Sequence, residues 1–355
     1  MRKLHHRYQI TNVKLYGGPL VTISVRDDRI VHVGDHLDGP NTIDGQGLIA
    51  LPGLVDPHVH FRHLGEDNKE DWEHAVDASI LGGVTTVGDM GNHPGPFAVT
   101  TAEAFAYKLR RLEQQRIRFQ LWFMALPHNL DQLPLILHDK TLRPHLAGIK
   151  VAMEETTGGL ILAQRKDQLA WAHVAADHDV LIAAHVGIQS LIDENRQRFV
   201  RPTMADHCVI RESKGEIDGG MQWLDILERT GARGHIAHIS TPELAAAKQE
   251  YCQRGVRVTA EMCPHHYFFD DKLMRSERAP LFKMNPPLRT PEQVVRLREC
   301  LLDGDTIDII ATDHAPHTSE EKHGEDYDKV PSGLPGVQER LPLTWELVHQ
   351  GRLSV

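Results

Sequence analysis

Two histidines at the end of a short apolar run are the first residues that could do chemistry. His58 and His60 close the segment LPGLVDPHVH, which predicts a strand over residues 54–60. Side chains two apart on a strand share a face, so the two imidazoles point the same way. Such a pair suits a divalent metal, although an isolated His-x-His is more often ordinary packing at a strand end.

Four more side chains with metal-binding chemistry follow strand-like runs of their own. They are Lys150, His185, His238 and Asp313. Taken singly, each histidine could be a hydrogen-bonded core residue, and the aspartate could cap a turn. His235 lies three residues before His238 and therefore faces the other side of the strand. We favour His238 as the ligand because it lies at the carboxyl end.

Lys150 stands out because it interrupts the apolar run AGIKVAM. An unpaired ammonium is costly to bury, and a lone lysine usually extends its charged end to solvent. The alternative is a carbamate, formed from the neutral amine and CO₂, whose two oxygens could bridge two metals about 3.5–4 Å apart. Asp313 could then ligate a metal and also act as general base and general acid. Together these residues predict a two-metal hydrolytic site.

Four loop residues are candidates for substrate contact. Arg62 shares the face of His60, and a guanidinium can bind a carboxylate through two parallel hydrogen bonds. Asn92 and Asn285 lie in the Pro/Gly-rich segments MGNHPGP and KMNPPLR, where turn formation explains an asparagine equally well. His317 follows the DHAPH segment and could face the substrate.

The elements that would position these residues alternate between strand and helix from residue 54 onward. We expect strands at 54–60, 84–90, 119–126, 148–153, 180–185, 234–239, 256–261 and 307–312. We expect helices at 71–82, 101–116, 166–178, 219–230, 242–254 and 291–303. This is the pattern of an α/β fold of the (β/α)₈ TIM-barrel type, in which active sites lie at the carboxyl ends of the strands.

The N-terminal segment has a different pattern from the rest of the chain. Residues 8–50 alternate as in β-strands, and Arg26-Asp27-Asp28 predicts a turn between two of them. We therefore expect a small outer β-sheet domain over residues 1–50 and a metal-dependent hydrolase barrel over 51–355.

Composition excludes several classes of protein. The 355 residues are 41% hydrophobic and 25% charged, as in soluble globular proteins. A formal net charge of −10 without a basic block argues against nucleic acid or anionic membrane as a partner. No apolar run could span a membrane, and the N-terminus lacks the apolar core of a signal peptide. Four scattered cysteines predict free thiols and a cytoplasmic protein.

Taken together, these motifs resemble those of the dihydroorotases, cyclic amidohydrolases of the amidohydrolase superfamily. The segments that carry the resemblance are PGLVDPHVHFR, MGNHPGP, GIKVAM, AHIST, TAEMCPHH, KMNPPLR, ATDHAPHTSEEK and PSGLPGVQERLPL. The resemblance implies a (β/α)₈ barrel with a binuclear zinc centre. It also implies reversible hydrolysis of (S)-dihydroorotate to N-carbamoyl-L-aspartate in de novo pyrimidine biosynthesis.

The resemblance assigns a role to each candidate residue. The ligands of one Zn²⁺ would be His58, His60 and Asp313, and those of the other would be His185 and His238. A carboxylated Lys150 would bridge the two metals, and Asp313 would be the catalytic proton carrier. The substrate carboxylate would be held by Arg62, Asn92 and His317, while Asn285 would approach the ring amide. The expected partners are other copies of the chain and aspartate transcarbamoylase.

The chain departs from the family pattern at three places. Family members often carry an acidic residue two positions after the fifth-strand histidine, where this chain reads His185-Val186-Gly187. Gly91 replaces the usual proline before Asn92. Family chains also continue through a final helix and strands that complete the outer sheet, so we interpret the chain end as a truncation or as a different closure of that sheet.

Two other functions fit parts of the pattern. A dihydropyrimidinase, hydantoinase or allantoinase would use the same metal ligands, but Arg62 and the NPPLR loop favour a ring that bears a carboxylate. A non-catalytic dihydroorotase-like scaffold that supports aspartate transcarbamoylase would be expected to lose ligands, and all six are present. Rates on a panel of cyclic amides would distinguish a dihydroorotase from the first alternative. The metal content of the purified chain would distinguish it from the second.

Overall fold

The chain divides into two compact units. The computed structural model describes residues 7–35, 41–112, 114–156 and 159–354. One unit spans Met1–Gly53 with Ser354–Val355, and the other spans Leu54–Leu353. The division into domains 1–50 and 51–355 that the sequence suggests stays a prediction about which parts fold independently.

The N-terminal unit is a small sheet with both antiparallel and parallel strand pairs. Its strands are β1 (Arg7–Leu15), β2 (Leu20–Arg26), β3 (Arg29–Gly34), β4 (Thr42–Asp44) and β5 (Ile49–Ala50). The path through the sheet runs β3-β2-β1-β4, and β5 also pairs with β1. Asp27 and Asp28 have φ angles of 50° and 62°, the left-handed values that suit a tight hairpin. The turn expected at Arg26-Asp27-Asp28 is therefore confirmed.

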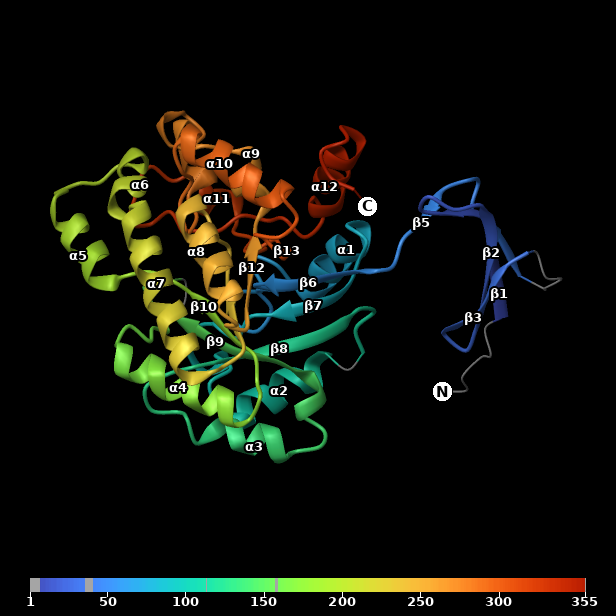
Figure 1. The fold of residues 1–355 in the computed structure, drawn as a ribbon, viewed down its shortest axis with the longest axis horizontal. Helices are drawn as coiled ribbons and strands as arrows, with labels where there is room; N and C mark the ends of the chain where they lie inside the picture. Colours follow the sequence, from blue (N-terminus) through green and yellow to red (C-terminus); the bar gives the residue numbers. More distant parts are fainter. Residues whose placement is uncertain (1–6, 36–40, 113, 157–158, 355) are drawn as a thin grey trace. The chain divides into compact units, whose positions relative to one another are not determined.

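The second unit is built on eight parallel strands that follow one another in chain order (Figure 1). They are β6 (Leu54–Val59), β7 (Val84–Asp89), β8 (Arg118–Met124), β9 (Leu146–Ala152), β10 (Ile182–His185), β11 (Gly234–Ile236), β12 (Val258–Met262) and β13 (Ile309–Ile310). Each lies at one of the eight predicted positions. The expected (β/α)₈ architecture is confirmed.

The helices of this unit mostly pack around the outside of the curled sheet (Figure 1). They are α1 (Trp72–Leu81), α2 (Ala102–Leu112), α3 (Gln132–His138), α4 (Arg165–Asp177), α5 (Gln189–Gln197), α6 (His207–Ile210), α7 (Ser213–Thr230), α8 (Pro242–Gln253), α9 (Pro264–Phe268), α10 (Pro291–Leu302), α11 (Ser319–Lys322) and α12 (Arg340–His349). Of these, α5 and α6 lie beyond α7, farther from the strands (Figure 1). Among the described residues, none of these helices has the length and apolarity needed to cross a membrane.

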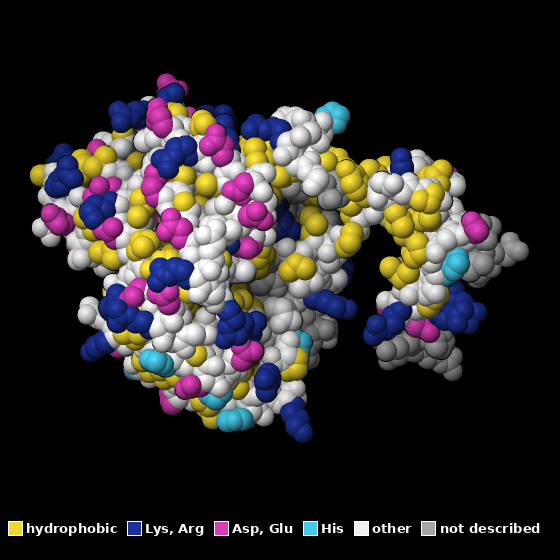
Figure 2. All heavy atoms as spheres, viewed as in Figure 1, with side chains coloured by type: hydrophobic (Ala, Val, Ile, Leu, Met, Phe, Trp, Pro, Cys, Tyr) yellow, Lys and Arg dark blue, Asp and Glu magenta, His cyan; other side chains and the backbone are white. Residues whose placement is uncertain are grey.

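Surface charge on the barrel unit is mixed. Lysine and arginine side chains alternate with aspartate and glutamate over the face that Figure 2 shows, without a continuous basic stripe. This agrees with the formal net charge of −10. The four cysteines, all within the described residues, are free thiols, as expected.

Helix α7 begins six residues earlier than the sequence predicted, at Ser213 and not at residue 219. Three glycines in its first part lower helix propensity and hid this start. They are Gly215, Gly219 and Gly220. One of them allows close packing, because a Cβ on Gly219 would lie 2.5 Å from the backbone nitrogen of Gly187. Packing of the helix against the barrel therefore outweighs the cost of the glycines.

The last strand is joined back to the first at the carboxyl end of the barrel. Val59 forms a parallel bridge with His314. Below it, the buried Asp56 accepts a hydrogen bond of 2.7 Å from the Thr312 hydroxyl. These contacts bring residues that follow β13 beside the end of β6, where His58 and His60 lie.

Arg340 supports the same junction from α12. Its Nη1 donates hydrogen bonds of 2.9 Å to the carbonyl oxygens of Val55 and Ile310, one on each of the joined strands. The same nitrogen lies 3.9 Å from Oδ1 of Asp56. Burial raises the pKa of Asp56, and the charge of the nearby guanidinium opposes that rise in part.

We expect Arg340→Met to destabilise the barrel by about 3 kcal/mol, because it leaves the Asp56 carboxylate buried without a cation. The melting temperature measured by calorimetry should fall by several degrees. Arg143→Met, at an exposed position, is the matched control. Equal melting temperatures for the two variants would contradict this role for Arg340.

Candidate metal centre

A polar cavity lies at the carboxyl ends of the barrel strands. Nine of the ten predicted site residues line it: His58, His60, Arg62, Asn92, Lys150, His185, His238, Asn285 and Asp313. The tenth, His317, is not part of the lining. The structure thus brings together side chains that are spread over most of the sequence.

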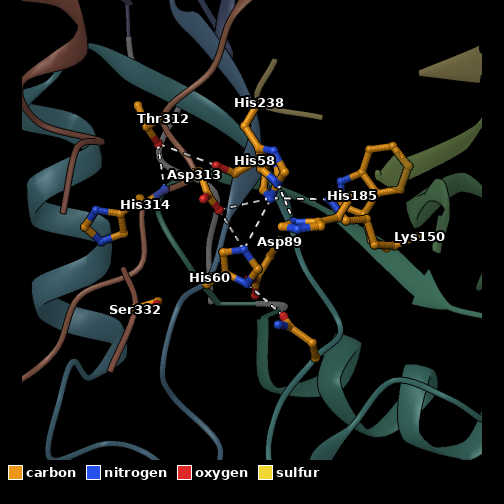
Figure 3. Close-up of polar contacts among 12 residues, drawn as sticks. His58, His60, Asp89, Lys150, His185, His238, Thr312, Asp313, His314 and Ser332 are labelled. Carbon is orange, nitrogen blue, oxygen red and sulfur yellow. Dashed lines mark hydrogen bonds and ion pairs between the residues drawn. The ribbon is translucent and has the colours of Figure 1, made fainter. Parts of the chain in front are cut away.

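Three of these side chains form a compact cluster (Figure 3). The Nε2 atoms of His58 and His60 are 3.2 Å apart, and Oδ1 of Asp313 lies 3.1 Å from the first and 2.9 Å from the second. The opposite ring nitrogens face oxygen acceptors. Nδ1 of His58 contacts Glu261, and Nδ1 of His60 lies 2.7 Å from Oδ1 of Asn92.

These contacts fix which ring nitrogens carry protons. A neutral imidazole has one N–H and one lone pair, and an N–H that faces an acceptor leaves the lone pair on the other nitrogen. In the neutral forms of His58 and His60 the lone pairs therefore lie on Nε2, beside Oδ1 of Asp313. These two nitrogens and the Asp313 oxygen converge as three potential ligand atoms, and this set fits a divalent metal ion.

The pKa values of the cluster residues also favour a bound cation. Burial lowers the pKa of His60 to about 4, so that its ring is neutral near pH 7. Burial alone would raise the pKa of Asp313, but His58 and His60 hold that pKa well below its ordinary value. Burial and Lys150 lower the pKa of His58, yet Glu261 and Asp313 more than offset them, and the pKa is raised. The site therefore attracts positive charge.

A second pair of histidines lies beside this cluster. Nδ1 of His185 is 2.9 Å from Nε2 of His238, and the His238 ring centroid is 5.3 Å from that of His58. Nε2 of His185 lies 3.1 Å from the Glu154 carboxylate, which leaves the lone pair of His185 on Nδ1. His185 and His238 can therefore present one nitrogen each to a second metal.

Lys150 lies between the two groups of ligands. Its Nζ is 3.5 Å from Nε2 of His58, and its charge also lowers the pKa values of His185 and His238. The side chain is only 5% exposed, so its amine does not reach solvent as a lone strand lysine usually does. Burial lowers the pKa of Lys150, which favours the neutral amine.

Arg62 is held by protein groups on several sides. Its Nε donates a hydrogen bond of 2.9 Å to the Pro316 carbonyl, and its Nη2 lies 3.1 Å from Nε2 of His317. Its Nη1 is 3.5 Å from the Glu66 carboxylate. Burial and the charge of Arg62 lower the pKa of His317 to about 2, so His317 is neutral and supports Arg62 from outside the cavity.

The two asparagines differ in what they contact. Oδ1 of Asn92 accepts a hydrogen bond from Nδ1 of His60, so Asn92 contacts a candidate metal ligand. Asn285 lines the cavity, and its Oδ1 accepts a hydrogen bond of 3.4 Å from the Ser332 hydroxyl. Contact of either residue with substrate stays a prediction.

Sequence reasoning missed two buried carboxylates, Glu154 and Glu261. Glu261 contacts His58, and its other oxygen lies 3.1 Å from Nε2 of His235. His235 also contacts Thr259 and does not line the cavity, in keeping with the preference for His238. A glutamate inside the apolar strand β12 is the same kind of signal as Lys150 in β9, and it could have been recognised in the same way.

The His265-His266 pair forms a separate buried cluster with Cys263, whose candidate ligand atoms lie within 4.8 Å of one another. Burial raises the pKa of the Cys263 thiol well above its ordinary value, so the thiol stays protonated. Nε2 of His266 donates a hydrogen bond of 3.1 Å to the Pro286 carbonyl. This cluster lacks the anionic ligand that Asp313 gives to the first.

The cluster of His58, His60 and Asp313 lies within a region that matches a known family. The sequence profile of the Amidohydrolase family matches residues 49–328. A dihydroorotase of Lactobacillus johnsonii is 34% identical over 325 residues, which cover 89% of this chain and 72% of that protein. A dihydroorotase of Halobacterium salinarum is 33% identical over 349 residues, which cover 97% and 78%.

Solved structures share the fold. An L-hydantoinase (dihydropyrimidinase) of Arthrobacter aurescens superposes with a TM-score of 0.88 at 24% identity, over 99% of this chain and 79% of that one. A dihydropyrimidinase of Brevibacillus agri gives a TM-score of 0.87 at 18% identity, over 99% and 78%. The family profile and the sequence relatives together show that the chain belongs to the amidohydrolase family, within its dihydroorotase branch.

Proposed function

We propose that the chain is a metal-dependent cyclic amidohydrolase that interconverts (S)-dihydroorotate and N-carbamoyl-L-aspartate by reversible hydrolysis. The observation that carries this proposal is one buried cavity that holds the converging ligand atoms of His58, His60 and Asp313 together with Lys150 and Arg62. The relatives named dihydroorotase support this choice of substrate, which places the reaction in de novo pyrimidine biosynthesis.

The residues present fit a pair of divalent metals, and we assign them to Zn²⁺. One metal would be held by His58, His60 and Asp313, the other by His185 and His238. Lys150, carboxylated, would bridge them: its neutral amine forms an N–C bond to CO₂ and loses a proton, which leaves an anion with two oxygens. Metals bound here would lower the pKa of water and polarise the ring amide carbonyl.

Asp313 would move the proton in this reaction. Its buried carboxylate is ionised, because the neighbouring His58 and His60 hold its pKa well below the ordinary value despite burial. It can accept a proton from the attacking water and return it to the amide nitrogen as the C–N bond breaks. In the reverse direction the free carboxyl group loses water as the ring closes, so acid favours ring closure.

Arg62 would fix the substrate carboxylate, so that the scissile amide carbonyl meets the ligand cluster in one orientation. Its guanidinium is 3% exposed and lies in the cavity wall beside the metal ligands. Asn92 and His317 would complete this clamp through the contacts that hold His60 and Arg62, and Asn285 would approach the ring amide.

A hydantoinase-type activity is the second candidate, because the solved structures with this fold include an L-hydantoinase and a dihydropyrimidinase. Those matches show the fold alone. The third candidate is a non-catalytic scaffold. Such a protein would not need the cluster of His58, His60 and Asp313 that this cavity retains. Assembly into a homo-oligomer, association with aspartate transcarbamoylase and a cytoplasmic location stay proposals of the same kind.

The substrate assignment is tested with dihydroorotate, hydantoin and dihydrouracil, the last two of which lack the carboxylate. The parent chain should hydrolyse dihydroorotate best. Arg62→Met should raise the KM for dihydroorotate by about tenfold or more, while the uncharged rings change little. Hydrolysis of each substrate by the parent chain and by Arg62→Met is followed by absorbance, with Arg143→Met as control. An equal effect on all three substrates would reject the clamp, and a parent that prefers hydantoin would favour the second candidate.

Asp313→Asn should separate proton transfer from metal binding. The amide keeps the shape and one oxygen ligand but cannot carry the proton, so kcat should fall by about a hundredfold or more while most metal is retained. Metal analysis of the same sample checks whether the metal is retained. Asp305→Asn, at an exposed position, is the control. A metal-loaded variant that keeps nearly the parent rate would exclude Asp313 as the proton carrier.

Lys150→Ala should lower the affinity for metal by about tenfold or more, because the bridging anion is lost. Added acetate or propionate should restore part of the metal content and rate, since each supplies two carboxylate oxygens in the vacated space. Zinc per chain is measured after dialysis, with the exposed Lys140→Ala as control. Full metal content and full rate in the variant would show that no bridge forms.

A further inference from the structure

Glu154 reaches His185 from the neighbouring strand. Glu154 lies two residues beyond the end of β9, and His185 is the last residue of β10, which pairs with β9. The carboxylate is buried, with 6% of the residue exposed, and its Oε1 lies 3.1 Å from Nε2 of His185. This bond directs Nδ1 of His185 toward His238.

The same carboxylate fills the space beside Gly187. A Cβ built on Gly187 would lie 1.8 Å from Oε2 of Glu154 and 2.3 Å from its Cδ. The backbone of Gly187 has no room to retreat, since Gly219 of α7 packs against its other side. A side chain at residue 187 and the carboxylate of Glu154 therefore compete for one place.

Arg211 holds this carboxylate. Its Nη1 donates a hydrogen bond of 2.6 Å to Oε1 of Glu154, and its Nη2 donates one of 2.6 Å to the backbone oxygen of Glu155. Burial opposes a charge on Glu154, but the hydrogen bond from His185 and the charge of Arg211 keep its pKa below the ordinary value. The group is thus an ionised, anchored acceptor.

We propose that Glu154 is the positioning residue for His185 and that residues 154 and 187 are coupled, so that an acidic side chain at one requires at the other a residue too short to reach the same space. Residue 187 lies two positions after His185, and its absent Cβ would point at the Glu154 carboxylate. An acidic group could therefore be supplied to His185 from either residue. In this chain Glu154, which follows the neighbouring strand β9, supplies the acidic group, and Gly187 leaves room for its carboxylate.

This inference rests on the proposed role of His185 as a metal ligand, and a double-mutant cycle tests it without any measurement of turnover. The variants are Glu154→Ala, Gly187→Glu and the two combined, with the exposed Glu155→Ala as the matched control. Zn²⁺ is titrated into each metal-free full-length chain by calorimetry in bicarbonate buffer. Circular dichroism and the melting temperature of the metal-free protein report whether each variant is folded.

Glu154→Ala should weaken binding of one Zn²⁺ by about 10–100-fold and leave the other unchanged. Gly187→Glu alone should lower the melting temperature, because two carboxylates compete for one space. The combined variant should recover both the melting temperature and most of the lost Zn²⁺ affinity. Glu155→Ala should match the parent chain in both measurements.

Three results would overturn the proposal. The first is parent-like affinity for both metals in Glu154→Ala. The second is a combined variant that is folded but binds Zn²⁺ no better than Glu154→Ala. The third is a combined variant that is no more stable than Gly187→Glu. If the parent chain binds two Zn²⁺ and the cycle behaves as expected but no cyclic amide is hydrolysed, the proposed function fails and the coupling stands.

Discussion

The barrel mouth depends on one constraint: several nitrogen and oxygen atoms that can bind a metal face one another in a buried space. The Nε2 atoms of His58 and His60 and Oδ1 of Asp313 lie within 3.2 Å of one another. Such an arrangement is unfavourable unless positive charge lies among these atoms. Only a rigid frame can hold it, and the bridge between Val59 and His314 provides that frame by joining the first strand to the segment that carries Asp313.

A second set of residues fixes the direction of the ligands, and each comes from another part of the barrel. His58 contacts Glu261 of β12, and His185 contacts a glutamate that follows β9. His60 contacts an asparagine that follows β7. In these three histidines the outer ring nitrogen faces an acceptor, so the inner nitrogen keeps its lone pair in the neutral ring. The ligands are therefore oriented by packing around the whole barrel and not by their own strands alone.

The sequence predicts this fold and cavity well where the signal is periodic or local. Eight apolar runs predict the strands, and nine of the ten site residues predicted near their carboxyl ends line the cavity. Glu261 gives a local signal, a glutamate inside a strand, but its partner His58 lies 203 residues away, so the contact between them could not be predicted. His317 does not line the cavity, and its contacts with Arg62 and Ser332 are tertiary contacts that no local pattern predicts.

We propose that one side chain, Arg62, selects a carboxylate-bearing ring over an uncharged one. The fold is common to hydrolases of both kinds of ring, and fold alone does not select a substrate. Arg62 is held by Pro316, His317 and Glu66, so its guanidinium is fixed before any ligand arrives and a bound carboxylate loses little rotamer freedom of the protein. In the proposed clamp, a ring without the carboxylate would lose the ion pair with this buried cation, which costs affinity. A cation that is oriented in advance is therefore the feature that supports the proposed selection for a charged ring.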